Sequence, residues 1–290
     1  MIRSKIGGIG FYVPERVVTN DDLTRVMETS DDWLRERTGI EERRYVERHK
    51  DTTSTMGTKA ARIAIERAGI EPGDVDFIIF ATLSPDYYFP GSGVLTQRQL
   101  GIQGIGALDI RNQCSGFVYG LSIADQYVKT GMYKNVLLIG AETHSIGLDF
   151  STRGRGVSVI FGDGAGAVVL QPTEDDNQGI LSTHLHADGD HAEKLSYLNP
   201  GSHSGIHHED KEQFGYPDQE FGGLFFTEKM YEEEDYFPYM DGQYVFKYAV
   251  TKFPEVIQEA LQTNGYEGKD IDMFVPHQAN LRISQFVQKR

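Results

Sequence analysis

Cysteine is almost absent from this chain, because Cys114 is the only one among 290 residues. One cysteine cannot form an internal disulfide, which fits a reducing compartment, and we expect a cytoplasmic protein. We expect neither a signal peptide nor a membrane span, because no apolar run is long enough for either. Basic residues are also too few to balance the acidic ones. The resulting net charge of −15 makes nucleic acid and anionic membranes unsuitable partners.

Metal-binding patterns are missing as well. The chain has no second cysteine and no H-E-x-x-H sequence. His184 and His186 would face the same way on a strand, and His203, His207 and His208 are close in sequence. Histidine clusters in loops are usually solvated, so we expect no metal site. The stretches "GIQGIG" and "GDGAGA" lack the helix and distal acid of a dinucleotide fingerprint, and we expect no cofactor.

Tryptophan occurs once, at Trp33, on a short helix predicted within "TSDDWLRERTGI". A lone tryptophan is commonly an anchor of the core. Arg35 and Arg37 lie beside it and permit a second interpretation, a nucleotide-binding edge. Indole and guanidinium groups both stack on adenine, so the two interpretations stay open from these residues.

Strand and helix patterns alternate along the rest of the chain. Continuous apolar runs at residues 76–82 and 135–143 predict buried strands, and residues 56–68 predict an amphipathic helix that ends at Gly69. The stretch "VSVIFGDGAGAVVLQP" predicts a strand, a glycine turn and a second strand. This alternation is typical of an α/β fold with helices on both faces of a sheet.

An internal repeat indicates a duplicated architecture. The segments "AIERAGIEPGDVDFIIFAT" and "ALQTNGYEGKDIDMFVPHQ" match without a gap, which pairs Gly69, Asp74 and Asp76 with Gly265, Asp270 and Asp272. Helix, turn, Asp-x-Asp and buried strand recur in the same order. We therefore predict two halves, residues 1–172 and 173–290. The second half carries a long acidic and aromatic stretch at about 184–239, which is typical of a lid or an interface.

Two residues in this pattern are candidates for chemistry. Cys114 falls between a predicted strand at 107–110 and a predicted helix at 115–129. Unpaired N–H groups at a helix N-terminus favour a thiolate, so we expect a lowered pKa and a nucleophile, with a buried structural cysteine as the alternative. His277 follows a predicted buried strand, where α/β sheets place ligand chemistry. The repeat brings the two strand ends together and suggests a Cys–His pair.

Several motifs closely resemble the β-ketoacyl-acyl-carrier-protein synthase III family, the initiating ketosynthases of the thiolase-like superfamily. They are "TSDDWLRERTGI", "QCSGFVYGLSIA", "RGVSVIFGDGAGAVVL", "FKYAV" and "VPHQANLRI". The resemblance covers about residues 1–172 and 240–290, in the family's order. It implies a thiolase-like α/β fold, a duplicated αβαβα five-layer sandwich that normally forms a homodimer. The C-terminal half would be incomplete in this chain, since family members continue past the position of Arg290.

The resemblance also implies an activity, the decarboxylative Claisen condensation of an acyl-CoA with malonyl-acyl-carrier protein. In it Cys114 would be the nucleophile that accepts the acyl group, and His277 would assist the decarboxylation. The enzyme would be an acyltransferase that starts fatty-acid or polyketide-type chains, with acyl-CoA as substrate and no cofactor. Implied binding residues are Thr29, Trp33, Arg37 and Arg155 at the CoA adenine, Asn280 near the pantetheine tunnel, Arg282 at its mouth, and Phe89 in the acyl pocket across the dimer.

The chain departs from the family pattern at three places. Asn112 and Gln113 precede Cys114 where small residues are usual, which predicts a change in pocket polarity. The family's Asn-containing "GNTSA"-type segment, which completes a Cys–His–Asn set, is expected beyond Arg290. The stretch at 184–239 is longer than the usual connection. Two other functions remain open: a non-decarboxylating condensation or acyl transfer to a small molecule, and an inactive acyl-binding or interaction module.

Overall fold

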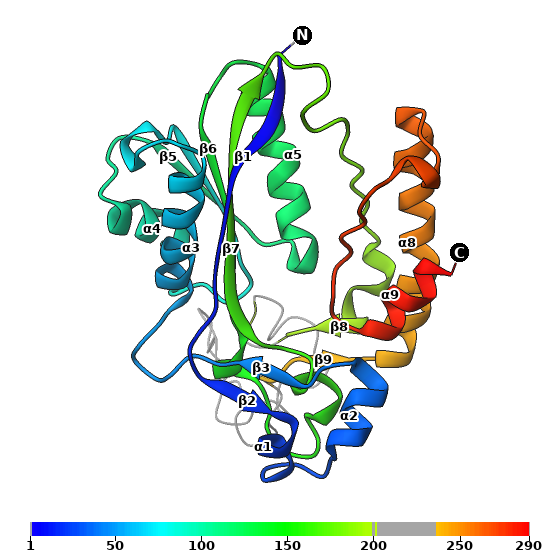
Figure 1. Cartoon of the computed structure of the whole chain (residues 1–290). Coiled ribbons are helices and arrows are strands. Elements are labelled where there is room, and N and C mark those ends of the chain that lie inside the picture. The colour runs from blue at the N-terminus through cyan, green and yellow to red at the C-terminus, as the bar shows by residue number, and fades with distance from the viewer. Residues whose placement is uncertain (1, 199–200, 202–235, 290) are drawn as a thin grey trace, which may run out of the picture.

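The computed structural model describes residues 2–198, 201 and 236–289 (Figure 1). His203, His207 and His208, and most of the acidic stretch predicted as a lid or interface, lie outside the described residues. Among the residues that the structure describes, none of the helices combines the length and apolarity needed to span a membrane.

A five-stranded mixed sheet forms the centre of the structure, in the order β1-β7-β6-β4-β5. Its strands are β1 (Arg3–Tyr12), β4 (Phe77–Ala81), β5 (Gly106–Ile110), β6 (Val136–Thr143) and β7 (Asp163–Thr173). Strand β4 runs parallel to both β5 and β6, whereas β7 runs antiparallel to both of its neighbours, β6 and β1. The parallel strands β4 and β5 therefore end at the same edge of the sheet, and Cys114 follows β5 there.

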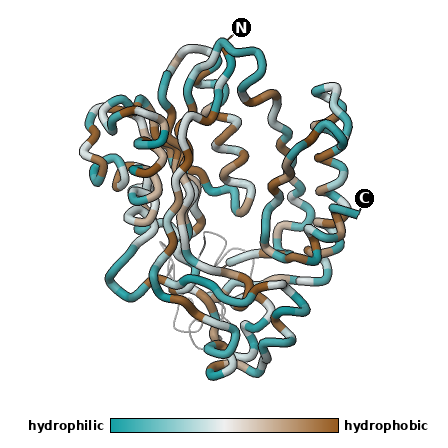
Figure 2. Tube along the Cα trace, in the orientation of Figure 1, coloured by the Kyte–Doolittle hydropathy of each residue, from teal (hydrophilic) through white to brown (hydrophobic). Residues whose placement is uncertain are grey.

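Helices cover both faces of this sheet (Figure 1). Helices α3 (Thr53–Arg67) and α4 (Ser92–Leu100) lie on one face, and α5 (Gly116–Lys129) lies on the other. Ile78 and Phe80 pack with the α3 side, whereas Ile79 packs with α5, so successive residues of β4 serve opposite cores. Figure 2 shows the hydrophobic positions gathered along these strands. The buried strands predicted from continuous apolar runs are confirmed as β4 and β6. Their residues are apolar without alternation because helices cover both faces of the sheet.

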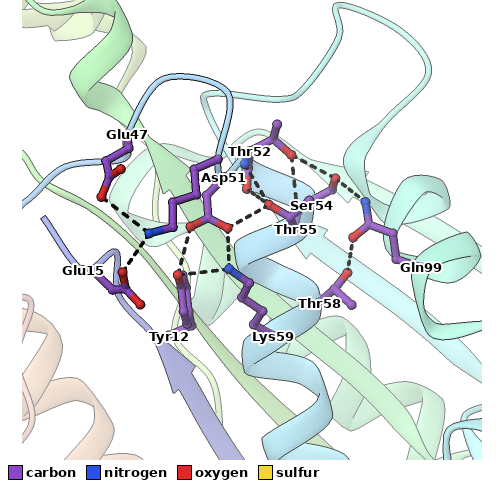
Figure 3. Close-up of polar contacts among 11 residues, drawn as sticks. Tyr12, Glu15, Glu47, Asp51, Thr52, Ser54, Thr55, Thr58, Lys59 and Gln99 are labelled. Carbon is purple, nitrogen blue, oxygen red and sulfur yellow. Dashed lines mark hydrogen bonds and ion pairs between the residues drawn. The ribbon is translucent and has the colours of Figure 1, made fainter.

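Strand β1 and helix α3 approach each other unusually closely. A Cβ atom at Gly10 would lie 2.1 Å from the carbonyl oxygen of Ala60, which no side chain tolerates. Polar side chains hold the same contact at its lower end, where Lys59 Nζ donates to the Tyr12 hydroxyl at 3.0 Å and the Tyr12 hydroxyl donates to the Asp51 carboxylate at 2.9 Å (Figure 3). The glycines of β1 thus permit the packing that fixes α3 on the sheet.

The structure confirms the helix end and the turn of the predicted internal repeat, but the strand predicted for its second copy is wrong. Gly69 ends the first helix and Gly265 ends α8 (Gly242–Asn264), and both have φ near +70°. Each is followed by a single-turn 3-10 helix, η1 (Pro72–Asp74) or η6 (Gly268–Asp270), whose aspartate accepts an N–H from the preceding glutamate. The buried strand expected before His277 is not formed. Met273 is 79% and Val275 74% exposed, and this stretch pairs with no strand of the described residues.

The strand predicted at the start of "VSVIFGDGAGAVVLQP" is also wrong. The chain instead forms the short helix α6 (Arg155–Ser158), and the N–H groups of Val157 and Ser158 both bond to Gly154 O at 2.9 Å. Val159 is buried in a separate small core with Leu23 and Leu34. The apolar run is explained by burial in that core rather than in the sheet. A short apolar run alone does not distinguish a strand from a helix, which is why the sequence predicted a strand here.

The remaining elements lie beside the main sheet. Strands β2 (Val17–Thr19) and β3 (Glu42–Arg44) pair with each other, as do β8 (Leu195–Ser196) and β9 (Tyr239–Met240). The short helices are α1 (Asn20–Thr24), α2 (Asp31–Thr38) and α9 (Leu281–Gln288). Thr19 caps α1, because its hydroxyl accepts the Asp22 N–H at 3.2 Å. The division into halves at residues 172 and 173 stays a prediction.

Candidate functional site

Cys114 lies in the turn that joins the sheet to α5. Strand β5 ends at Ile110, the 3-10 helix η2 (Gln113–Ser115) follows, and α5 begins at Gly116. Gln113 has a φ of +47°, a left-handed conformation that costs a residue with a side chain about 1 kcal/mol or more. A Cβ atom at Gly116 would lie only 3.1 Å from Ala81 Cβ, so the turn sits directly on the end of β4. This arrangement leaves the residue Cys114 exposed, although protein atoms partly surround its sulfur.

The lowered thiol pKa expected from the sequence is wrong. Burial of the sulfur among protein atoms raises the pKa of Cys114, and the Glu142 carboxylate raises it further. The helix N-terminus does not compensate, because Cys114 precedes α5 by two residues instead of lying in its first turn. The free thiol is consequently protonated at neutral pH.

Glu142 is a residue that sequence reasoning missed. It lies near the end of β6, where its carboxylate accepts the N–H groups of Leu83 and Ser84 at 2.9 and 3.1 Å and the Ser84 hydroxyl at 2.6 Å. Three donors hold the carboxylate in place. A fixed negative charge therefore faces the turn that carries Cys114.

The raised pKa gives a prediction for thiol reactivity. We expect alkylation of Cys114 by iodoacetamide to keep increasing with pH beyond the ordinary thiol range of about 8.5, because only the thiolate reacts. Glu142→Gln removes the negative charge, and its alkylation profile is expected to shift to lower pH. Intact-mass spectrometry measures both rates on the single cysteine. Glu66→Gln, at an exposed position of α3, is the matched control, and an unchanged profile for Glu142→Gln would contradict the role of its charge.

His277 precedes α9 at the end of the extended stretch that the sequence predicted as a strand. Its side chain is accessible, yet protein atoms packed around the imidazole lower the pKa of His277 below its ordinary value. The ring is therefore neutral at pH 7 and offers one N–H donor and one acceptor. Among the described residues, no hydrogen bond joins His277 to Cys114, so the predicted Cys–His pair stays a prediction.

The Trp33 indole lies beside two guanidinium groups, those of Arg37 and Arg155. The guanidinium carbon of Arg155 lies 4.8 Å from the centre of the indole ring, and that of Arg37 lies 5.5 Å away. Arg35 does not join them, because it pairs with Asp31 and Glu41. Thr29 lies just before this helix, and its hydroxyl is buried without a hydrogen-bond partner. These groups form a cationic, aromatic edge on an otherwise acidic molecule.

Asn280 and Arg282 belong to α9, which packs against the Trp33 helix. A Cβ atom at Gly39, just after α2, would lie 2.6 Å from Leu281 Cβ. Asn280 caps α9 by accepting the Arg282 N–H at 2.9 Å, and the Arg282 guanidinium lies 5.7 Å from the centre of the Phe246 ring. Two elements far apart in sequence thus bring the predicted substrate-binding residues into one region.

Phe89 belongs to a loop between β4 and α4 that carries three consecutive aromatic side chains. Tyr87, Tyr88 and Phe89 are 56%, 71% and 81% exposed. A pocket of about 170 Å³ is lined by Tyr87 and Tyr88 of this loop and by Ile110 and Arg111, which precede Cys114 in the chain. The predicted acyl-pocket residue is therefore on the surface, next to the segment that carries the nucleophile.

His184 and His186 share one carboxylate, although the segment that holds them is irregular and not the predicted strand. Glu259 of α8 bonds His184 Nδ1 at 3.0 Å and His186 Nε2 at 2.7 Å. These bonds connect the segment after β7 to α8. In the described part of the chain, no group of three or more His, Cys, Asp or Glu side chains is arranged to hold a metal ion.

Comparison with known proteins identifies relatives across the whole chain. The family described as 3-oxoacyl-[acyl-carrier-protein (ACP)] synthase III matches residues 108–189, which include Cys114. The β-ketoacyl-[acyl-carrier-protein] synthase III of Xanthomonas campestris pv. campestris (strain 8004) is 43% identical over 289 residues, covering 100% of this chain and 80% of the relative. The synthase of the same name from Aliivibrio fischeri is 43% identical over 287 residues, 99% of this chain and 80% of that protein.

Solved structures give the same result. The 3-oxoacyl-[acyl-carrier-protein] synthase III of Aquifex aeolicus VF5 superposes with a TM-score of 0.83 at 37% identity, over 99% of this chain and 80% of that one. The priming β-ketosynthase of the R1128 polyketide pathway superposes with a TM-score of 0.82 at 30% identity, over 99% and 78%. The fold is therefore thiolase-like, and the chain belongs to the β-ketoacyl-[acyl-carrier-protein] synthase III family.

Proposed function

We propose that this enzyme condenses an acyl-CoA with malonyl-acyl-carrier protein to give a β-ketoacyl product, the first elongation step of a fatty-acid or polyketide-type chain. The observation that carries the proposal is the accessible lone thiol at the common end of β4 and β5, in a chain 43% identical to synthases III over its full length. That edge of an α/β sheet is where ligand chemistry is located.

The proposed reaction has two covalent stages. In the first, the Cys114 sulfur attacks the thioester carbon of acyl-CoA, the acyl group moves to Cys114, and CoA leaves with the proton as a free thiol. In the second, malonyl-acyl-carrier protein loses CO₂, and the resulting carbanion attacks the acyl-cysteine carbon. A carbon–carbon bond forms, the carbon–sulfur bond to Cys114 breaks, and the thiol is regenerated by a proton. The scheme predicts ping-pong kinetics.

His277 is proposed to act in the second stage. Loss of CO₂ leaves negative charge on the thioester oxygen of the malonyl-derived group, and a neutral imidazole can donate its N–H to that oxygen. The lowered pKa of His277 keeps the ring neutral across the physiological range. A neutral ring also does not form an ion pair with the malonyl carboxylate, whose departure the reaction requires.

The edge around Trp33 is proposed to bind CoA. Adenine stacks on the indole and guanidinium planes of Trp33, Arg37 and Arg155, and the buried Thr29 hydroxyl can pair with a polar atom of the ligand. Asn280 and Arg282 would contact the pantetheine arm and the phosphates or the acidic carrier protein. Local positive charge at this edge opposes the repulsion that the net charge of −15 exerts on anionic substrates.

The working enzyme is proposed to be a cytoplasmic homodimer without a cofactor. The support for a second copy is the exposed Phe89 beside β5, an edge strand that pairs on one side only among the described residues. Aromatic side chains of this size are common anchors of interfaces. In this arrangement Phe89 of one copy would line the acyl pocket of the other.

A product assay tests the proposed function. Incubation with acetyl-CoA and malonyl-acyl-carrier protein is expected to give β-ketoacyl-carrier protein and one CO₂ for each product formed. Product without CO₂, or without dependence on malonyl groups, would support a non-decarboxylating condensation instead. CoA binding with no turnover would support an inactive binding module.

Removal of the Trp33 indole is expected to weaken acyl-CoA binding. Stacking of a base on an aromatic ring contributes about 1–3 kcal/mol, so Trp33→Ala should raise KM for acyl-CoA by roughly 5- to 150-fold. The kcat at saturating substrate should change little, because the indole is remote from bond making. Steady-state kinetics measure both. Arg35→Ala is the matched control on the same helix, and a similar rise in KM for that variant would indicate general disruption of α2.

A further inference from the structure

The aromatic loop at residues 87–89 has a rigid base. Asp86 stands directly before it, and this carboxylate accepts the N–H of Ser54 at 3.0 Å, the Ser54 hydroxyl at 2.8 Å and the Ser92 hydroxyl at 2.8 Å. Ser54 and Ser92 are 1% and 0% exposed. Ser54 belongs to the first turn of α3 and Ser92 to the first turn of α4. The Asp86 carboxylate therefore joins the loop to the buried first turns of two helices, α3 and α4.

A second layer of side chains supports the Asp86 partners. Gln99 Nε2 donates to the Ser54 hydroxyl at 2.9 Å, and Gln99 Oε1 accepts from the Thr58 hydroxyl at 2.6 Å (Figure 3). Gln99 lies on α4 and Thr58 on α3, so this chain of bonds crosses between the two helices. Because each side chain is held by another, the position of the Asp86 carboxylate is fixed by the packing of α3 on α4.

Asp109 of β5 holds the other end of the same loop. Its carboxylate accepts the N–H groups of Ser92 at 2.6 Å and Gly93 at 2.9 Å. A Cβ atom at Gly91 would lie 2.4 Å from the Asp109 carboxyl carbon, and one at Gly93 would lie 2.7 Å from Oδ1, so glycine is required at both positions. The aromatic loop is thus fastened before its first tyrosine by Asp86 and after its proline by Asp109.

The fastened loop faces the segment that carries the nucleophile. Tyr87 and Tyr88 of the loop line the pocket of about 170 Å³ together with Ile110 and Arg111. Cys114 follows Arg111 by three residues. A change in the angle of the loop therefore changes the space beside the turn where an acyl group is attached, and it also moves Phe89.

We propose that Asp86 is a positioning residue for acyl-group selection, acting through the aromatic loop at residues 87–89. The inference rests on the proposed function, since it concerns the acyl chain that Cys114 accepts. Asp86 touches no substrate in this scheme. Its three hydrogen bonds determine where the aromatic side chains stand, and these side chains determine which acyl chains fit. Without the carboxylate, the Ser54 N–H and the hydroxyls of Ser54 and Ser92 lose this acceptor, and the loop loses its side-chain bonds to α3.

Two substitutions at Asp86 separate positioning from charge. Asp86→Ala removes all three bonds, and we expect the ratio of kcat/KM for acetyl-CoA to that for octanoyl-CoA to change by about tenfold or more, as displacements of about 1 Å near a reacting group do. Asp86→Asn keeps most of the network, because its oxygen can accept from Ser54 N and Ser92 Oγ while its amide donates to Ser54 Oγ. We expect this conservative variant to retain a ratio within about twofold of wild type.

Two further measurements make the test specific. Phe89→Ala shortens the loop's side chain without touching Asp86 and should alter the same ratio. Alkylation of Cys114 by iodoacetamide should be the same in Asp86→Ala as in wild type, because the nucleophile turn is held by β4 and β5. If Asp86→Ala does not fold, Ser92→Ala removes one of the three donors and should change the ratio in the same direction to a smaller extent.

The outcomes distinguish this inference from the function on which it rests. A wild-type enzyme that forms no β-ketoacyl product would overturn the proposed function. A wild-type enzyme that forms product, with an unchanged acyl-CoA ratio in Asp86→Ala and a lower melting temperature, would overturn only the role of Asp86 and leave it a structural residue. A changed ratio in Phe89→Ala together with an unchanged ratio in Asp86→Ala would also overturn it.

Discussion

Cys114→Ala is expected to abolish formation of the β-ketoacyl product, with a loss of at least about 10³-fold in kcat/KM. The reason is that both stages of the proposed reaction pass through an acyl thioester on this sulfur, and the chain has no other thiol that can carry it. Intact-mass spectrometry after incubation with acetyl-CoA should show one added acetyl group on the wild-type enzyme and none on the variant. The same spectrum counts any further acyl groups on the protein.

The control for this variant is substrate binding. Because Trp33 is the only tryptophan, its fluorescence reports occupancy of the proposed CoA edge without a label. Cys114→Ala should bind CoA with wild-type affinity, since the indole lies on α2 and the thiol lies between β5 and α5. Wild-type rates of product formation in Cys114→Ala would contradict covalent catalysis at this residue.

His277→Ala is expected to slow condensation by about 10²- to 10⁴-fold, the range typical of losing one positioned proton donor. Acyl transfer from acyl-CoA to Cys114 should survive in this variant, because His277 is proposed to act on the malonyl group alone. Rapid-quench measurements separate the two stages: acyl-enzyme should accumulate while CO₂ release becomes slow. Equal slowing of both stages would contradict the assignment.

The pH dependence of condensation follows from the direction of the His277 pKa. Burial disfavours the charged imidazole and lowers the pKa of His277 below its ordinary value of about 6.5. The folded enzyme therefore keeps a neutral ring at a pH where an ordinary histidine is half protonated. Condensation should lose activity only as the pH falls below about 6.5, and this acid limb should be missing from the residual rate of His277→Ala.

Long periodic segments made much of the fold predictable. The helix expected at 56–68 and the strand expected at 76–82 are α3 and β4, because an amphipathic stripe and a doubly covered strand leave clear patterns in sequence. The apolar run at 157–161 was misassigned, since a small separate core buries it. The apolar run at 273–276 has the residue types of a strand, but it pairs with no strand among the described residues. Residue composition alone does not show whether a segment finds a pairing partner.

The candidate site was predictable in its positions and not in its electrostatics. Cys114 was located from the strand and helix on either side of it, both of which are local signals. Its pKa is raised first by burial of the thiol and then by the Glu142 carboxylate of β6, a strand that follows the whole of α5 in the sequence. Asp86 and Asp109 carry no local pattern either, because their hydrogen bonds join four separate elements. Contacts between distant segments were therefore the part that sequence reasoning missed.

The order of strands in the sheet has a consequence for synthesis of the chain. Strand β1 is made first, yet its partner is β7, with Arg3 opposite Thr173. At about 5–20 residues per second, the ribosome needs on the order of ten to thirty seconds to supply that partner. Throughout this interval β1 presents unpaired N–H and C=O groups, which are templates for aggregation. Nascent-chain chaperones that hold β1 should therefore determine the yield of this protein during expression.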